Sequence, residues 1–165
     1  MDIRLLPRNT RCLVDANILI YHLNGASLEC RDFLSRVENG EVEAYLTTIV
    51  VAEVLHRQML IEAVGKGLVT TGNILRKLKK NPEIIGRLTD YISSVENLIT
   101  LPFHILRIEN DDLVQSHGIR NINNLFVNDS INLACALRND IVDVISRDED
   151  FTRVTGVDVW SPKDI

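Results

Sequence analysis

The stretch Arg11–Leu23, RCLVDANILIYHL, consists of a short, mostly apolar run, one aspartate and a second apolar run. The first run is typical of a buried β-strand, and the second fits a short helix. Asp15 therefore stands where the chain leaves the strand and enters the helix. Ligands of parallel sheets bind beyond the carboxyl ends of the strands, so this position predicts a functional edge.

The rest of the chain alternates between short β-branched runs and helical patterns. We expect further strands at 43–46, within 99–108, at 141–145 and at 157–160. Helices are predicted at 28–39, 48–64, 70–80, 82–97, 111–117 and 128–137, with Ser27 and Thr47 or Thr48 as caps and Gly118 as a stop. The alternation predicts an α/β fold, a three-layer α/β/α sandwich with a mostly parallel central sheet.

The composition indicates one globular domain spanning residues 1–165, since 45% of the residues are apolar and 25% charged. The net charge of −5 excludes uniform electrostatic attraction to nucleic acid or to an anionic membrane. No apolar stretch reaches the roughly 20 residues of a membrane span, so we expect no membrane contact. Cys12, Cys30 and Cys135 lack paired spacing and suit the core of a cytoplasmic protein.

Four acidic residues occupy unusual positions. Asp15 and Asp148 follow predicted strands, Asp129 begins the apolar helix DSINLACAL, and Glu53 lies inside the apolar segment TTIVVAEVLHR. If these helices start at the edge where the strands end, the four carboxylates converge. Two carboxylates 4 Å apart repel each other by about 4 kcal/mol at an effective dielectric near 20, so protons or cations must neutralise them. Oxygen ligands suit Mg²⁺ or Mn²⁺ better than Zn²⁺.

Each acid also has a purely structural interpretation. Asp15 and Asp129 can cap helices, and Asp148 can be a turn residue in SRDED. Glu53 is costly to bury alone, and its best structural partner is Arg57, one helical turn later. The functional interpretation therefore depends on the four acids as a set.

The segments LVDANILIYHL, TTIVVAEVLHR, NDSINLACAL and ISRDEDF, in this order, resemble the PIN-domain nucleases, and most of all the VapC-like toxin ribonucleases. The resemblance covers Arg11 to about Trp160. It implies that Asp15, Glu53, Asp129 and Asp148 bind Mg²⁺ or Mn²⁺ and cleave RNA, leaving a 3′-hydroxyl and a 5′-phosphate. Asp150 is a weaker candidate metal ligand.

The resemblance also implies roles for neighbouring residues and partners. Asn17 is expected to orient Asp15, and Ser146 to hydrogen-bond an acid or a phosphate. A toxin of this family would bind an antitoxin protein, and homodimers are common among its relatives. Compared with many compact toxins, the segment at about 65–98 adds a helical insert.

The charge is unevenly distributed along the chain. Arg57–Arg107 contains eight basic and four acidic residues, a net charge of +4, so the remainder carries −9. Within this segment, RKLKK could contact RNA phosphates or could be a solvated helix face. Its basic residues are Arg76, Lys77, Lys79 and Lys80.

These features favour a metal-dependent endoribonuclease, the toxin of a type II toxin–antitoxin pair. The alternatives are a stand-alone RNA-processing nuclease and a noncatalytic interaction module on the same fold. Aspartyl phosphate chemistry fits less well, because position 17 is Asn rather than a second Asp and no Lys is convincingly placed after a late strand.

Overall fold

A central sheet of five parallel strands organises the computed structural model, which describes residues 1–165. The strands are β1 (Arg11–Val14), β2 (Glu43–Thr47), β3 (His104–Leu106), β4 (Asp143–Ile145) and β5 (Asp158–Trp160), in the order β3-β2-β1-β4-β5. All four pairings are parallel. The predicted parallel α/β sandwich is therefore confirmed, with a fully parallel sheet.

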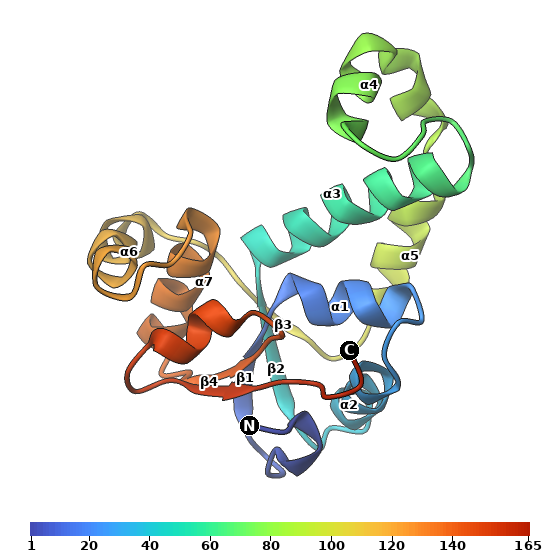
Figure 1. Cartoon of the computed structure of the whole chain (residues 1–165). Helices are drawn as coiled ribbons and strands as arrows, with labels where there is room; N and C mark the ends of the chain where they lie inside the picture. Colours follow the sequence, from blue (N-terminus) through green and yellow to red (C-terminus); the bar gives the residue numbers. More distant parts are fainter.

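Seven α-helices connect and cover the strands (Figure 1). They are α1 (Ala16–Leu23), α2 (Leu28–Glu38), α3 (Thr48–Gly65), α4 (Ile74–Lys80), α5 (Asp90–Ile99), α6 (Asn110–Asn123) and α7 (Val127–Arg138). Three short 3₁₀ helices complete the chain: η1 (Ile3–Leu5), η2 (Pro82–Arg87) and η3 (Glu149–Arg153). None of these helices has both the length and the apolar character needed to cross a bilayer.

Alternating residues of the strands pack into two separate hydrophobic cores, one on each face of the sheet. Cys12 and Val14 of β1 face a core built with α1, α2, α3 and α5, whereas Leu13 faces the opposite core with α7 and Phe151. This alternation is the consequence of the two-residue period of a strand. The sheet therefore lies between two helical layers.

The second half of α3 extends past the sheet and carries α4 at its far end (Figure 1). Ala63 of α3 packs there with Leu78 of α4 and with Ile84 and Leu88, forming a small third core. Val95 and Leu98 of α5 return to the main core. We propose that the chain is one domain in which residues 65–98 form a helical arm.

The predicted helix at 70–80 is too long, because α4 begins only at Ile74. Gly72 and Asn73 adopt positive φ values of 78° and 50°, which no helix interior accommodates.

The predicted helix at 82–97 is also wrong, since the segment divides into η2 and α5. Glu62 accepts backbone hydrogen bonds from Thr89 and Tyr91 and so favours a new helix start there.

The predicted stop at Gly118 is wrong as well, because α6 continues to Asn123. Ile119 packs against the core that contains Leu133, and this contact offsets the roughly 1 kcal/mol cost of a glycine inside a helix. Asn124, with a φ of 55°, ends the helix instead. The strands at 141–145 and 157–160 are shorter than predicted, starting at Asp143 and Asp158.

Candidate active site

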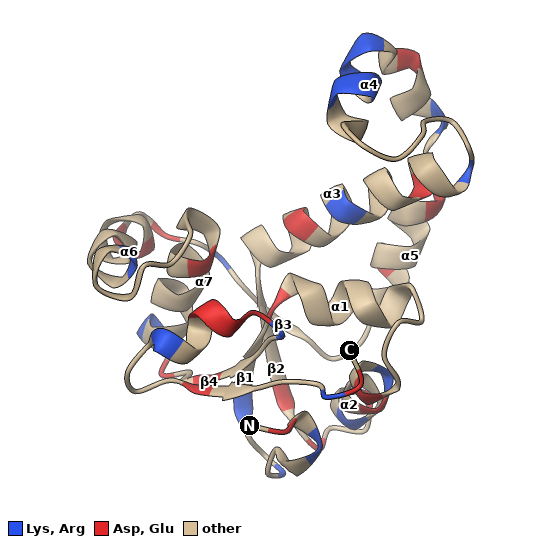
Figure 2. Ribbon diagram, in the orientation of Figure 1, with Lys and Arg blue, Asp and Glu red and all other residues tan.

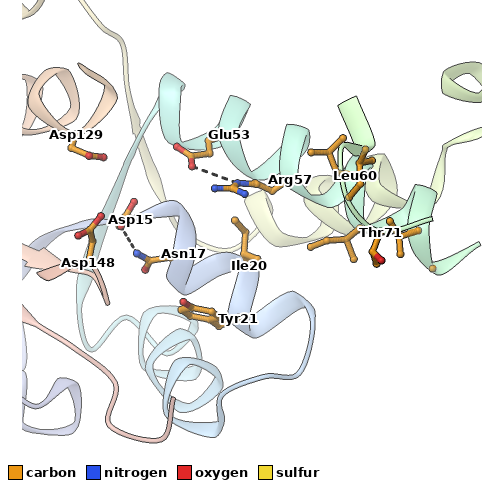
Figure 3. A pocket seen from close by; sticks show the side chains of 14 residues that line it. Asp15, Asn17, Ile20, Tyr21, Glu53, Arg57, Leu60, Thr71, Asp129 and Asp148 are labelled. Atoms are coloured by element: carbon orange, nitrogen blue, oxygen red, sulfur yellow. Dashed lines mark hydrogen bonds and ion pairs between the residues drawn. The ribbon is translucent and has the colours of Figure 1, made fainter. Parts of the chain in front are cut away.

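Four acidic side chains from four separate elements face one common space at the acidic end of a pocket (Figure 3). Asp15 is the N-cap of α1, and Asp148 is the N-cap of η3. Asp129 lies in the first turn of α7, and Glu53 lies in the second turn of α3. All four line the same pocket, which has a volume of about 730 Å³.

Asp15 is held by a hydrogen-bond network that joins β1 and β4. Its Oδ1 accepts the Ala16 backbone N–H at 2.7 Å, and its Oδ2 accepts the Ser146 hydroxyl at 2.6 Å. The Asn17 side-chain amide donates both to Asp15 Oδ2, at 2.5 Å, and to Ser146 Oγ, at 3.1 Å. Asp15 therefore serves as a helix cap and still has its orientation fixed by two neighbouring polar side chains.

The same network fixes the loop that carries Asp148. The Asp148 backbone N–H donates to Ser146 Oγ at 2.9 Å, and the Arg147 N–H donates to Asn17 Oδ1 at 3.3 Å. Asp148 Oδ1 accepts the Asp150 backbone N–H at 2.8 Å. Asp150 itself pairs with Arg153 at 2.8 Å and does not line the pocket.

Burial and mutual repulsion raise the pKa of two of these acids. Desolvation is the largest cause of the rise in the pKa of Asp15 to about 6, with the charges of Glu53 and Asp148 adding to it and the Ser146 hydrogen bond opposing it. The pKa of Asp129 rises to about 7, first through burial and then through the charges of Asp15, Asp148 and Glu53. The four acids thus form a region where added positive charge is favourable.

The pocket continues from the acids into an apolar end between α1 and α3. Glu53, Arg57, Leu60, Ile61 and Val64 share one face of α3, as their spacing of three and four residues requires. The remaining apolar lining residues are Ile20, Tyr21 and Ile74. This apolar end was not predicted from the sequence, because apolar residues spaced three and four apart after Glu53 are equally typical of a helix face that packs in a core.

The basic residues of RKLKK do not line the pocket. They belong to α4, at the tip of the arm, where Figure 2 shows the basic side of this region. The Lys77 ammonium donates to the Thr70 hydroxyl at 2.6 Å and to the Thr70 and Thr71 carbonyls at 2.9 and 3.0 Å. Lys77 therefore holds the loop before α4, whereas the side chains of Arg76, Lys79 and Lys80 make no hydrogen bond within the protein.

The chemistry of the donor set fits a divalent cation that prefers oxygen. The acidic end offers only carboxylate oxygens, and Glu53 has its side chain turned toward Arg57, 3.9 Å away. As the side chains stand, no group of three or more His, Cys, Asp or Glu residues is arranged to hold an ion. Binding would therefore require the carboxylates to move together, with a cation offsetting the repulsion that separates them.

Comparisons with known proteins agree with this architecture. The PIN domain family model matches residues 12–157. Ribonuclease VapC2 of Methanocaldococcus jannaschii is 31% identical over 156 residues, covering 94% of this chain and 97% of the relative.

Two solved structures share the fold at lower identity. VapBC2 from Rickettsia felis, bound to a DNA fragment from its promoter, has a TM-score of 0.62 at 11% identity and covers 92% of this chain and 98% of its own. VapBC-1 from nontypeable Haemophilus influenzae has a TM-score of 0.55 at 16% identity, with coverages of 92% and 98%. The chain is therefore a member of the PIN domain family, and it resembles the VapC-like members of that family.

Proposed function

We propose that this protein is an endoribonuclease that depends on Mg²⁺ or Mn²⁺ and acts as the toxin of a toxin–antitoxin pair. The observation that carries the proposal is the gathering of Asp15, Glu53, Asp129 and Asp148 from four elements at one end of a pocket. The 31% identical relative is named a ribonuclease, which supports the choice of RNA as substrate.

In the proposed mechanism the four carboxylates would hold the cation, and Asp150 would contribute only negative charge from outside the pocket. A divalent ion held there would polarise a phosphodiester, lower the pKa of a water and stabilise the leaving oxygen. The Asn17 amide and the Ser146 hydroxyl keep Asp15 pointed into the pocket. Water adds to phosphorus, the bond from phosphorus to O3′ breaks, and the products are a 3′-hydroxyl and a 5′-phosphate.

The decisive experiment is cleavage of an RNA pool with Mg²⁺ or Mn²⁺, followed by mapping of the new ends. The proposal expects 5′-phosphate ends from the wild type, no cleavage in EDTA, and no cleavage by Asp129→Asn. Cleavage that persists in EDTA, or that is unchanged in the variant, would contradict it. Mn²⁺ binding without any cleavage would favour a noncatalytic module.

An antitoxin is the proposed protein partner. The apolar end of the pocket, with Ile20 and Ile61 among its lining residues, provides a surface that a peptide segment could cover. Two of the solved structures with this fold are VapBC complexes, in keeping with such a partner. Co-purification with the product of the neighbouring gene tests this: no bound protein would favour a stand-alone RNA-processing nuclease.

A homodimer is also proposed, and its surface is available on the α6–α7 side. Val114, Ile122 and Phe126 there have exposed fractions of 64%, 81% and 75%. Large apolar side chains exposed on α6 and at the start of α7 are candidates for such an interface. Light scattering of the purified protein distinguishes a dimer from a monomer.

A further inference from the structure

Arg57 is the only basic side chain among the residues that line the pocket. It lies on α3 between the acidic end and the apolar end, with its guanidinium directed toward Glu53 (Figure 3). A single cation among four carboxylates is an obvious counter-ion. The Arg57 side chain makes only one long ionic contact, however, which points to a second role.

The ion pair between Arg57 and Glu53 is loose. Arg57 Nε and Glu53 Oε1 are 3.9 Å apart, and the Arg57 side chain is 61% exposed. The Arg57 guanidinium donates no hydrogen bond within the protein, so all five of its N–H donors are free for another ligand. An exposed pair of this kind contributes little to stability, and α3 does not need it.

Arg138 shows what a structural arginine looks like in this fold. Its guanidinium donates to both carboxylate oxygens of buried Asp112, at 2.7 and 2.9 Å, and to the Arg107 carbonyl at 3.1 Å. Arg138 therefore has its donors satisfied within the protein. Arg57 has the opposite arrangement, because it is exposed, weakly paired and beside the candidate active site.

We propose that Arg57 binds a phosphate of the RNA backbone beside the bond that is cleaved, and that its loose pair with Glu53 keeps the guanidinium near the acids when RNA is absent. This inference rests on the proposed function. Phosphate oxygens match the planar fork of a guanidinium and form charge-assisted hydrogen bonds with it. The guanidinium donors are free in either case, and Glu53 turning toward a bound cation would remove the one ionic partner that competes with the phosphate.

The location of the other basic residues supports this assignment. Arg76, Lys79 and Lys80 lie on α4 at the tip of the arm, beyond the apolar end of the pocket, and Lys77 is engaged by the loop before α4. These residues could contact RNA only at a distance from the acids. Within the pocket itself, Arg57 is the one side chain that can offset the negative charge of a second phosphate.

The test measures RNA binding separately from cleavage. A fluorescein-labelled single-stranded RNA is titrated with wild type, Arg57→Gln and Arg57→Lys at several salt concentrations, with Ca²⁺ in place of Mg²⁺ to suppress cleavage. Arg31→Gln is the matched control, because Arg31 is 60% exposed, pairs with Asp32 on α2 and does not line the pocket. Mn²⁺ binding of each protein is measured by calorimetry, and thermal unfolding confirms that each is folded.

We expect Arg57→Gln to bind RNA about tenfold more weakly, as the loss of one charge-assisted contact implies. The slope of log affinity against log salt should fall in magnitude by about 0.7, the value for one phosphate contact on a single strand. The RNA affinity of Arg57→Lys should lie between those of wild type and Arg57→Gln, and the RNA affinity of Arg31→Gln should match that of wild type. Mn²⁺ affinity should be unchanged or tighter in Arg57→Gln, because a competing positive charge is removed.

RNA binding by Arg57→Gln that equals that of Arg31→Gln would overturn the inference while leaving the proposed function intact. Loss of Mn²⁺ binding in Arg57→Gln would also overturn it, since Arg57 would then serve the carboxylates rather than RNA. Failure of the wild type to bind Mn²⁺ would instead refute the proposed function itself.

Discussion

Replacing Asp129 by Asn should stabilise the protein at pH 8 when no divalent cation is present. The pKa of Asp129 rises from 3.8 to about 7 in the fold, through burial and the charges of Asp15, Asp148 and Glu53. Three pKa units correspond to at most about 4 kcal/mol by which ionisation opposes folding, and solvent screening of this partly exposed carboxyl lowers that figure. The amide of Asn must still be desolvated, so we expect a gain of about 2–4 kcal/mol. For a chain of this size, that gain raises the midpoint of thermal unfolding by roughly 5–12 °C.

The sign of the pH dependence provides the check. When folding raises the pKa of a carboxyl, the free energy of unfolding is unaffected below the pKa that the carboxyl has in the unfolded chain. The protein then loses stability as the pH rises through the pKa of the folded state. The gain in Asp129→Asn should therefore be largest at pH 8 and fall to less than about half at pH 5. Urea unfolding in EDTA at both pH values measures it.

A surface aspartate gives the control for this experiment. Asp32 on α2 is 68% exposed, so Asp32→Asn should change the free energy of unfolding by less than about 0.5 kcal/mol at either pH. No gain in Asp129→Asn at pH 8, or an equal gain at pH 5, would refute the view that repulsion among the four acids opposes folding.

Three further predictions concern the cation, the ion pair between α6 and α7, and the helical arm. Mn²⁺ at 100 times its dissociation constant should stabilise the wild type by about 2.7 kcal/mol, and this gain should vanish in Asp15→Asn; calorimetric unfolding measures both. Arg138→Ala should destabilise the protein by about 3 kcal/mol at pH 7, because it leaves the buried Asp112 carboxylate unpaired. The Arg138 hydrogen bonds lower the pKa of Asp112, so this loss should shrink as acid protonates that carboxylate, as urea unfolding at low pH would show. Glu62→Gln should weaken the attachment of α5 to α3 by about 1–2 kcal/mol, and faster proteolysis in the loop after Gly65 would report it.

The sequence predicts the elements that local signals define. The strand before Asp15 and the Ser27 cap of α2 are confirmed, and of the two candidate caps of α3, Thr47 and Thr48, the structure shows Thr47. These predictions succeed because each depends on a buried apolar run or on a side chain that caps the residues directly after it. The order of strands in the sheet depends on contacts distant in sequence, and the same is true of the helix start near Asp90, where Glu62 supplies the hydrogen bonds.

The candidate site shows the same division between local and distant information. Four acids at strand ends and helix starts can be chosen from their apolar surroundings alone. The hydrogen bond from Asn17 to Ser146 joins residues 129 positions apart, and only the resemblance to a family suggested roles for both. The apolar end of the pocket has no chemical signature, because aliphatic residues on a helix usually indicate core.

The proposed function requires Asp15, Glu53, Asp129 and Asp148 to hold a divalent cation together. Anomalous diffraction from crystals soaked in Mn²⁺ tests it most directly. We expect a manganese peak at the acidic end of the pocket within about 2–2.5 Å of carboxylate oxygens from at least two of these residues. No peak there in soaked wild-type crystals, or an equally strong peak in Asp129→Asn crystals, would contradict it.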